Sequence, residues 1–145
     1  MAYDPPSLKD GEKIKEVMTK SNSNSHILIV DDEPQIHTVL TKLLEKEGFS
    51  VAGAFNAEEA YQQIEKKRPR LIILDVMMPR ISGIDVCNRI KENPDTSDIL
   101  ILILSARDQQ ADRLAGFTHG ADDYVSKPFH LQALMRKVHH MLEKV

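Results

Sequence analysis

From His26 onward the chain alternates between short apolar runs and longer segments with helical spacing. The longest apolar runs are unbroken, which is typical of strands buried on both faces of a parallel sheet. The apolar runs predict five strands, at residues 27–30, 51–54, 71–74, 99–104 and 121–125. The segments between and after them predict five helices, at residues 34–47, 56–67, 82–92, 108–118 and 130–144. Strict alternation of the two favours a doubly wound α/β domain.

Residues 1–25 differ from the rest of the chain. They end in the run Ser21-Asn22-Ser23-Asn24-Ser25, whose small polar side chains cannot bury enough apolar surface to offset the entropy of ordering. We therefore expect a flexible N-terminal extension at residues 1–25 and one folded domain at residues 26–145. Partial helical spacing predicts a short, marginal helix from Ser7 to Lys20. This extension is either inert or a small docking or dimerisation element.

Composition narrows the class of protein. Hydrophobic residues make up 41% of the 145 residues and charged residues 28%, as in an ordinary globular domain. The net charge of -3 gives no basic footprint, so we expect neither direct nucleic-acid binding nor attraction to an anionic membrane. The polar start does not resemble a secretory signal, and one cysteine, Cys87, permits no internal disulfide. These features suit a cytoplasmic protein.

Polar side chains follow four of the five predicted strands. In a doubly wound sheet, ligands bind at the carboxyl ends of the strands. The residues found there are Asp31-Asp32-Glu33, Asp75, Ser105 and Lys127-Pro128. Each has a local explanation: either aspartate of the first group, for example, could cap the helix that begins near Pro34. Their convergence at one edge of the sheet nevertheless favours a common site.

The chemistry of such a site follows from its residue types. Clustered carboxylates repel one another and require a cation or a proton. Oxygen ligands in a partly open site suit Mg²⁺, whereas zinc would call for cysteine or paired histidine ligands. A carboxylate can attack phosphorus and form an aspartyl phosphate, while a metal ion and a lysine neutralise the transferred group. The sequence therefore favours phosphoryl chemistry.

Residues 26–144 resemble the receiver domain of two-component response regulators. The resemblance lies in IVDDE (29–33), LDVMMP with Gly83 (74–83), LSA (104–106) and GADDYVSKPF (120–129). It implies a flavodoxin-like sheet with strand order 2-1-3-4-5. It also implies a phosphorylation-dependent switch that catalyses only its own aspartyl phosphorylation and dephosphorylation.

The resemblance assigns a role to each residue at the sheet edge. Asp75 stands at the position of the phosphoacceptor, with Ser105 and Lys127 as its catalytic partners. Asp31, Asp32, Asp75 and the backbone carbonyl of Met77 would hold Mg²⁺. Ser105 and Tyr124 would form the conformational switch. The bond between Lys127 and Pro128 is expected to be cis.

The resemblance also implies partners. They are a sensor histidine kinase or phosphotransfer protein, and a downstream effector protein or an output domain missing from this chain. The readout surface, and a homodimer interface, would lie within residues 107–144. We expect a stand-alone receiver slightly more than a fragment of a longer regulator.

Three other classes of protein remain open. A magnesium phosphatase would show two acids spaced by one residue after the first strand, and a flavin-binding module would show a Ser/Thr/Gly-rich loop there. Here that position holds adjacent aspartates. A degenerate receiver that only binds proteins would lack a site residue, yet all five are present in the sequence.

Overall fold

The computed structural model describes residues 25–78, 80–106 and 120–143. Five parallel strands form one sheet in the order β2-β1-β3-β4-β5, which confirms the predicted sheet. The strands are β1 (His26–Val30), β2 (Ser50–Ala54), β3 (Leu71–Asp75), β4 (Leu100–Ala106) and β5 (Asp123–Lys127).

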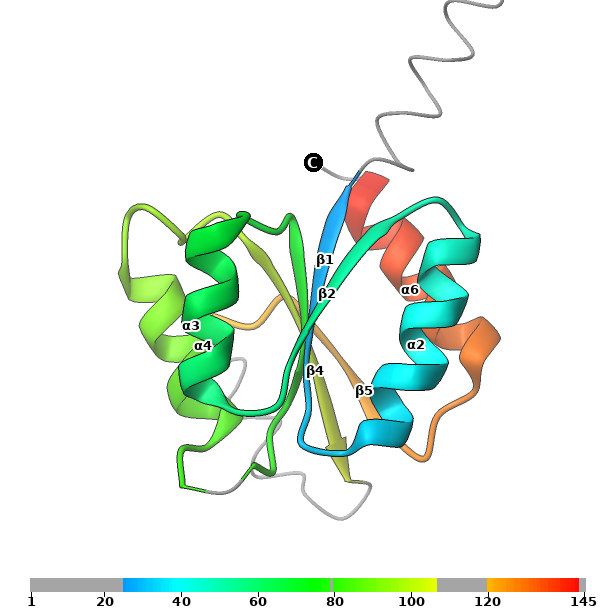
Figure 1. The fold of residues 1–145 in the computed structure, drawn as a ribbon, viewed down its shortest axis with the longest axis horizontal. Helices are drawn as coiled ribbons and strands as arrows, with labels where there is room; N and C mark the ends of the chain where they lie inside the picture. The colour runs from blue at the N-terminus through cyan, green and yellow to red at the C-terminus, as the bar shows by residue number, and fades with distance from the viewer. Residues whose placement is uncertain (1–24, 79, 107–119, 144–145) are drawn as a thin grey trace, which may run out of the picture.

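Helices cover both faces of this sheet. Figure 1 shows α3 (Ala57–Lys66) and α4 (Gly83–Glu92) on one face, and α2 (Pro34–Lys46) and α6 (Leu131–Glu143) on the other. These four match four of the five predicted helices. The predicted helices at residues 7–20 and 108–118 lie outside the described residues, as does nearly all of the predicted N-terminal extension.

The sheet separates two apolar layers. Successive side chains of a strand point to opposite faces, so one unbroken apolar run contributes to both layers. In β1, for example, Leu28 packs with the layer under α3 and α4, while Ile27 and Ile29 pack with the layer under α2 and α6. All three are at most 1% exposed. The unbroken runs of the sequence thus reflect helices on both sides.

The loop between β2 and α3 is fixed by reciprocal bonds. The Asn56 side chain accepts a hydrogen bond from the Glu59 backbone N–H at 2.8 Å and thereby caps the N-terminus of α3. Glu59 Oε1 in turn accepts a hydrogen bond from the Phe55 N–H at 2.8 Å. This pairing resembles a capping box and holds Phe55 in place.

Two strands extend further toward their carboxyl ends than the apolar pattern predicted. β4 continues through Ser105 to Ala106, and β5 begins at Asp123 rather than at residue 121. The sequence analysis located strands by apolar side chains, whereas pairing depends on the backbone: Ser105 pairs with Ser126, and Ala106 with Lys127. Ser105 and Lys127 therefore lie within paired strands rather than in the loops that follow them.

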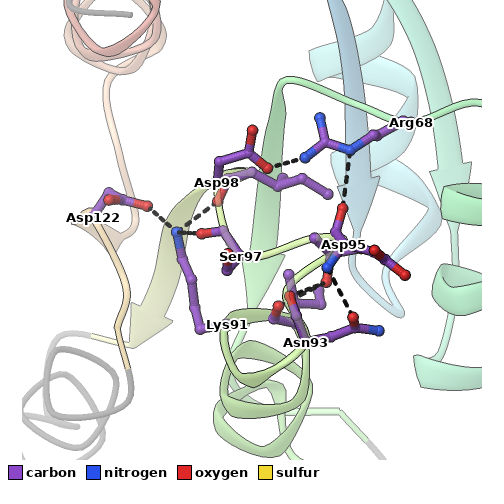
Figure 2. A network of polar contacts seen from close by, with 10 residues as sticks. Arg68, Lys91, Asn93, Asp95, Ser97, Asp98 and Asp122 are labelled. Carbon is purple, nitrogen blue, oxygen red and sulfur yellow. Dashed lines mark hydrogen bonds and ion pairs between the residues drawn. The ribbon is translucent and has the colours of Figure 1, made fainter.

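At the end of the sheet opposite the acidic residues, Lys91 of α4 joins the segments that precede β4 and β5, as Figure 2 shows. Its Nζ donates to the carbonyl oxygens of Ser97 at 3.2 Å and Ile99 at 2.6 Å, and forms an ion pair with Asp122 at 3.0 Å. The Lys91 side chain is only 15% exposed. One ammonium group thus joins the end of α4 to the segments that lead into β4 and β5.

Replacing Lys91 by Met should lower the free energy of unfolding by about 2 kcal/mol, because the carbonyl of the buried Ile99 loses a charged donor and the ion pair with Asp122 is broken. The matched control is Arg68→Met, which breaks the exposed ion pair with Asp98 in the same network. That change should cost about 0.5 kcal/mol or less, since exposed ion pairs contribute little. Urea unfolding of the two variants measures the difference, and equal losses would contradict this account of Lys91.

Candidate functional site

Three carboxylates gather where β1 and β3 end. Asp31 and Asp32 follow β1, Asp75 is the last residue of β3, and one ligand oxygen from each lies within 4.8 Å of the others. We call these three residues the acidic cluster. Asp31 is fully buried and Asp75 is 3% exposed, whereas Asp32 is exposed. The structure therefore brings together the three carboxylates that the sequence analysis named.

Local bonds hold the two buried carboxylates. Asp31 Oδ1 accepts a hydrogen bond from the Glu33 N–H at 2.9 Å, and Asp75 Oδ1 accepts one from the Met77 N–H at 3.1 Å. The N-cap residue of α2 is Glu33, whose side chain makes no capping bond. The acidic pair after β1 therefore does not serve as the side-chain cap of α2.

Gly83 allows α4 to approach the backbone of Asp75 closely. A Cβ atom at Gly83 would lie 2.2 Å from the Asp75 carbonyl oxygen, which no side chain could tolerate without movement. The Gly83 N–H donates to the Val76 carbonyl at 2.9 Å, and Ser82 Oγ caps α4 by accepting from the Ile84 N–H at 3.0 Å. This packing fixes the main chain at the end of β3.

Lys127 provides the positive charge next to the acidic cluster. Its Nζ lies 3.1 Å from Asp31 Oδ2, 3.1 Å from Glu33 Oε1 and 3.6 Å from Asp75 Oδ1. The peptide bond between Lys127 and Pro128 is cis. The sequence analysis gave no role to Glu33, although its place directly after the aspartate pair could have suggested one.

Burial and charge both shift proton affinities in the site. Burial, reinforced by the charge of Asp31, raises the pKa of Asp75 from 3.8 to about 6, against the opposing effects of Lys127 and the Met77 N–H. Burial alone would lower the pKa of Lys127, but the hydrogen bond to Asp31 and the charge of Asp75 outweigh it and raise that pKa. The site therefore favours additional positive charge.

Ser105 contributes a buried hydroxyl to the same edge. The residue is fully buried, and its Oγ has no hydrogen-bond partner among the described residues. A buried hydroxyl without a hydrogen-bond partner lowers the stability of the fold and calls for a specific explanation. The neighbouring residue Leu104 pairs with Asp75 in the sheet, and the Leu104 carbonyl accepts a hydrogen bond from the Val76 N–H at 3.0 Å. The Ser105 hydroxyl therefore lies near the end of β4, next to the end of β3 that carries Asp75.

Tyr124 lies on the strand next to Ser105. It pairs with Ile103 and packs with the apolar layer under α3 and α4, on the face that Ser105 shares with Ile103. The Lys137 Nζ lies 5.9 Å from the centre of the Tyr124 ring. The residues proposed as a switch thus lie on adjacent strands of one face.

The residues present suit a divalent cation that prefers oxygen ligands. The ammonium group of Lys127 lies close to Asp31, Glu33 and Asp75, and Asp32 completes the acidic cluster. Mg²⁺ prefers carboxylate, carbonyl and water oxygens and retains several waters, which matches a cluster that is buried on one side and open at Asp32.

Comparison with known proteins identifies the class. A family model described as the response regulator receiver domain matches residues 27–139. The chain belongs to this family, the receiver domains of two-component response regulators. Within the described residues, no helix combines the length and apolar character needed to cross a membrane.

Individual relatives agree with this assignment. The chain is 40% identical over 118 residues to the phosphate regulon transcriptional regulatory protein PhoB of Rhizobium meliloti, an alignment that covers 81% of this chain and 52% of PhoB. It is 41% identical over 118 residues to the response regulator MprA of Mycobacterium avium, covering 81% and 51% respectively. The chain thus spans about half the length of these curated relatives.

Solved structures share the fold. A putative response regulator from Chloroflexus aurantiacus superposes with a TM-score of 0.78 at 38% identity, covering 83% of this chain and 98% of that one. The receiver domain of a signal transduction histidine kinase from Syntrophus aciditrophicus gives 0.77 at 33% identity, covering 83% and 92%.

Replacing Asp75 by Asn should stabilise the metal-free protein at neutral pH but not at acidic pH. Well below pH 3.8, the ordinary pKa of this carboxyl, the group is protonated in both the folded and unfolded states, so ionisation costs no stability. As the pH rises through about 6, wild type loses stability because the buried carboxyl must ionise. A shift of about two pKa units corresponds to at most about 3 kcal/mol.

Urea unfolding in EDTA at about pH 3 and about pH 8, on either side of both pKa values, measures this difference between wild type and Asp75→Asn. The control variant Asp95→Asn alters an exposed aspartate on the loop after α4 and should be about as stable as wild type. An Asp75→Asn variant that is no more stable than wild type at pH 8 would contradict the raised pKa.

Proposed function

We propose that this receiver domain is a phosphorylation switch in which Asp75 accepts a phosphoryl group from a phosphohistidine with the help of Mg²⁺. The donor would be a sensor histidine kinase or a phosphotransfer protein. The observation that carries the proposal is the convergence of the acidic cluster, the Lys127 ammonium and the unpartnered Ser105 hydroxyl at the ends of four strands.

The carboxylates of Asp31, Asp32 and Asp75, with the Met77 carbonyl, would hold Mg²⁺. When bound, the ion supplies positive charge that offsets the repulsion between the carboxylates and the phosphoryl oxygens. It would also favour the ionised form of Asp75, which burial and Asp31 disfavour in its absence.

In the proposed step, a carboxylate oxygen of Asp75 attacks phosphorus and a new P–O bond forms. The P–N bond to the donor imidazole breaks, and the ring nitrogen keeps the electron pair. Ser105 Oγ would donate to one phosphoryl oxygen, which gives the buried hydroxyl the partner it lacks. Lys127 would donate to another, exchanging part of its contact with Glu33. Attack by water on the acyl phosphate would reset the switch.

The signal would be read on the surface that β5 and α6 share. Lys137 of α6 forms a 3.1 Å ion pair with Asp123 of β5, and its ammonium also approaches the Tyr124 ring. Movement of Tyr124 would therefore reach α6 directly. A downstream effector protein, an output domain or a second copy of the chain would bind this surface.

Intact-mass analysis with Mg²⁺ and a small-molecule phosphodonor tests the acceptor. Wild type should gain the mass of one phosphoryl group, and Asp75→Asn should gain none because its amide cannot act as the nucleophile. The control Asp95→Asn alters an exposed aspartate on the loop after α4 and should behave as wild type. An adduct that persists in Asp75→Asn would refute the acceptor assignment, and no adduct in any protein would favour a degenerate receiver.

Replacing Ser105 by Ala should stabilise the unphosphorylated protein by about 1 kcal/mol, because an unsatisfied buried hydroxyl is removed. The same variant should accept the phosphoryl group more slowly, since one donor to the phosphoryl oxygens is lost. Urea unfolding and the time course of adduct formation measure the two effects. Ser126→Ala, at the paired position on β5, is the control. A less stable Ser105→Ala with an unchanged rate would contradict this role.

A further inference from the structure

His37 of α2 reaches the main chain of the acidic cluster. Its Nε2 lies 2.6 Å from the carbonyl oxygen of Asp31, and the residue is only 9% exposed. A carbonyl oxygen can only accept a hydrogen bond, so the Nε2 atom carries the proton of this bond. The site described above uses the side chain of Asp31 but does not account for this contact with its backbone.

The imidazole ring occupies a narrow slot. The Phe55 ring stacks on it with centroids 4.0 Å apart and planes inclined by 25°. On another side lies Gly53 of β2, where a Cβ atom would be 2.7 Å from His37 Nδ1. Only glycine at position 53 leaves room for the ring. The ring is therefore held between α2, β2 and the loop that precedes α3.

Asp31 is held at each of its polar groups. Its N–H donates to the Ala54 carbonyl at 3.1 Å, and its two carboxylate oxygens accept from the Glu33 N–H and from Lys127. The remaining group, its carbonyl, accepts from His37. Without that bond a buried carbonyl would lose its donor, and the peptide that orients the Asp31 carboxylate would be free to rotate.

We propose that His37 is a positioning residue for Mg²⁺ binding. By fixing the Asp31 peptide, it aims the Asp31 carboxylate at Asp75 and Lys127 before the ion arrives. This inference rests on the proposed function, because it assumes that the acidic cluster is the magnesium site.

Magnesium affinity, measured by isothermal titration calorimetry of the intact protein with MgCl₂, tests the inference. His37→Leu removes the donor and should weaken binding about tenfold, the lower end of the effect seen when a group that orients a metal ligand is lost. His37→Gln keeps an N–H donor at a similar reach and should restore most of the affinity. A role in folding alone would not produce this rescue.

Gly53→Ala provides a second variant that leaves the donor in place. The added methyl group would meet Nδ1 and push the ring out of its slot, so magnesium binding should again weaken by several fold. An imidazole ¹⁵N spectrum should show a protonated Nε2 at His37 in wild type and a changed signal in Gly53→Ala. An unprotonated Nε2 in wild type would overturn the inference.

The matched control is His26→Leu. His26 is also buried, at 7% exposed, but it lies at the opposite end of β1, where its Nδ1 is 2.8 Å from Ser50 Oγ. This variant should lose stability in urea while keeping the magnesium affinity of wild type.

The possible outcomes distinguish a failure of the proposed magnesium site from a failure of the role proposed for His37. A wild type that binds no Mg²⁺ overturns the proposed function and the inference together. A wild type that binds Mg²⁺ while His37→Leu binds equally well overturns the inference alone. Equal weakening in His37→Leu and His26→Leu also overturns it, because the effect would then follow general stability.

Discussion

The repulsion between buried carboxylates is the constraint on which the rest of the structure depends. Asp31 and Asp75 lie within one cluster and are almost wholly removed from water. Burial and the charge of Asp31 together raise the pKa of Asp75, so without a cation this carboxyl tends to take up a proton. Lys127 offsets part of the repulsion but is shared among three acidic residues. Burial of Asp31 and Asp75 at the carboxyl ends of the strands therefore contributes less stability than burial of apolar side chains would.

A site of this kind needs a rigid support that does not itself depend on the site. Two apolar layers supply it, because helices cover both faces of the sheet and the central residues of β1, β3 and β4 are at most 1% exposed. At the far edge, Lys91 satisfies two carbonyls and one carboxylate at once. Among the described residues, the buried side-chain oxygen without a hydrogen-bond partner is Ser105 Oγ, and it lies where chemistry is proposed. Such departures from complete pairing are often found at functional sites.

The sequence was sufficient to predict the sheet and the residues at its edge. Unbroken apolar runs gave the strands, and the polar residues at their carboxyl ends gave Asp31, Asp75, Ser105 and Lys127. The start of β5 was wrong by two residues, because Asp122 bonds to the backbone of Ile101 through its side chain before the ladder begins.

Contacts between distant segments were not predictable from one sequence. The bond of Glu33 to Lys127 spans 94 positions: the place of Glu33 after the aspartate pair could suggest a role, but it does not identify Lys127 as the partner. The slot of His37 depends on the register that brings Gly53 beside α2, so the residue resembled any other histidine without metal-ligand spacing. Roles that arise from a side chain acting through a neighbour's backbone leave no motif.

The placement of Lys127 and Tyr124 on one strand suggests how a charge at Asp75 would be transmitted. β5 is the last strand in the sheet order, so in the described part of the chain it is paired only to β4. An edge strand held by a single ladder can shift more easily than β1 or β3, which are paired on both sides. A phosphoryl group that drew Lys127 and Ser105 toward itself would act on β5 and on its neighbour β4 together. Since Asp123 ties β5 to Lys137, the displacement would reach α6 without any rearrangement of the core.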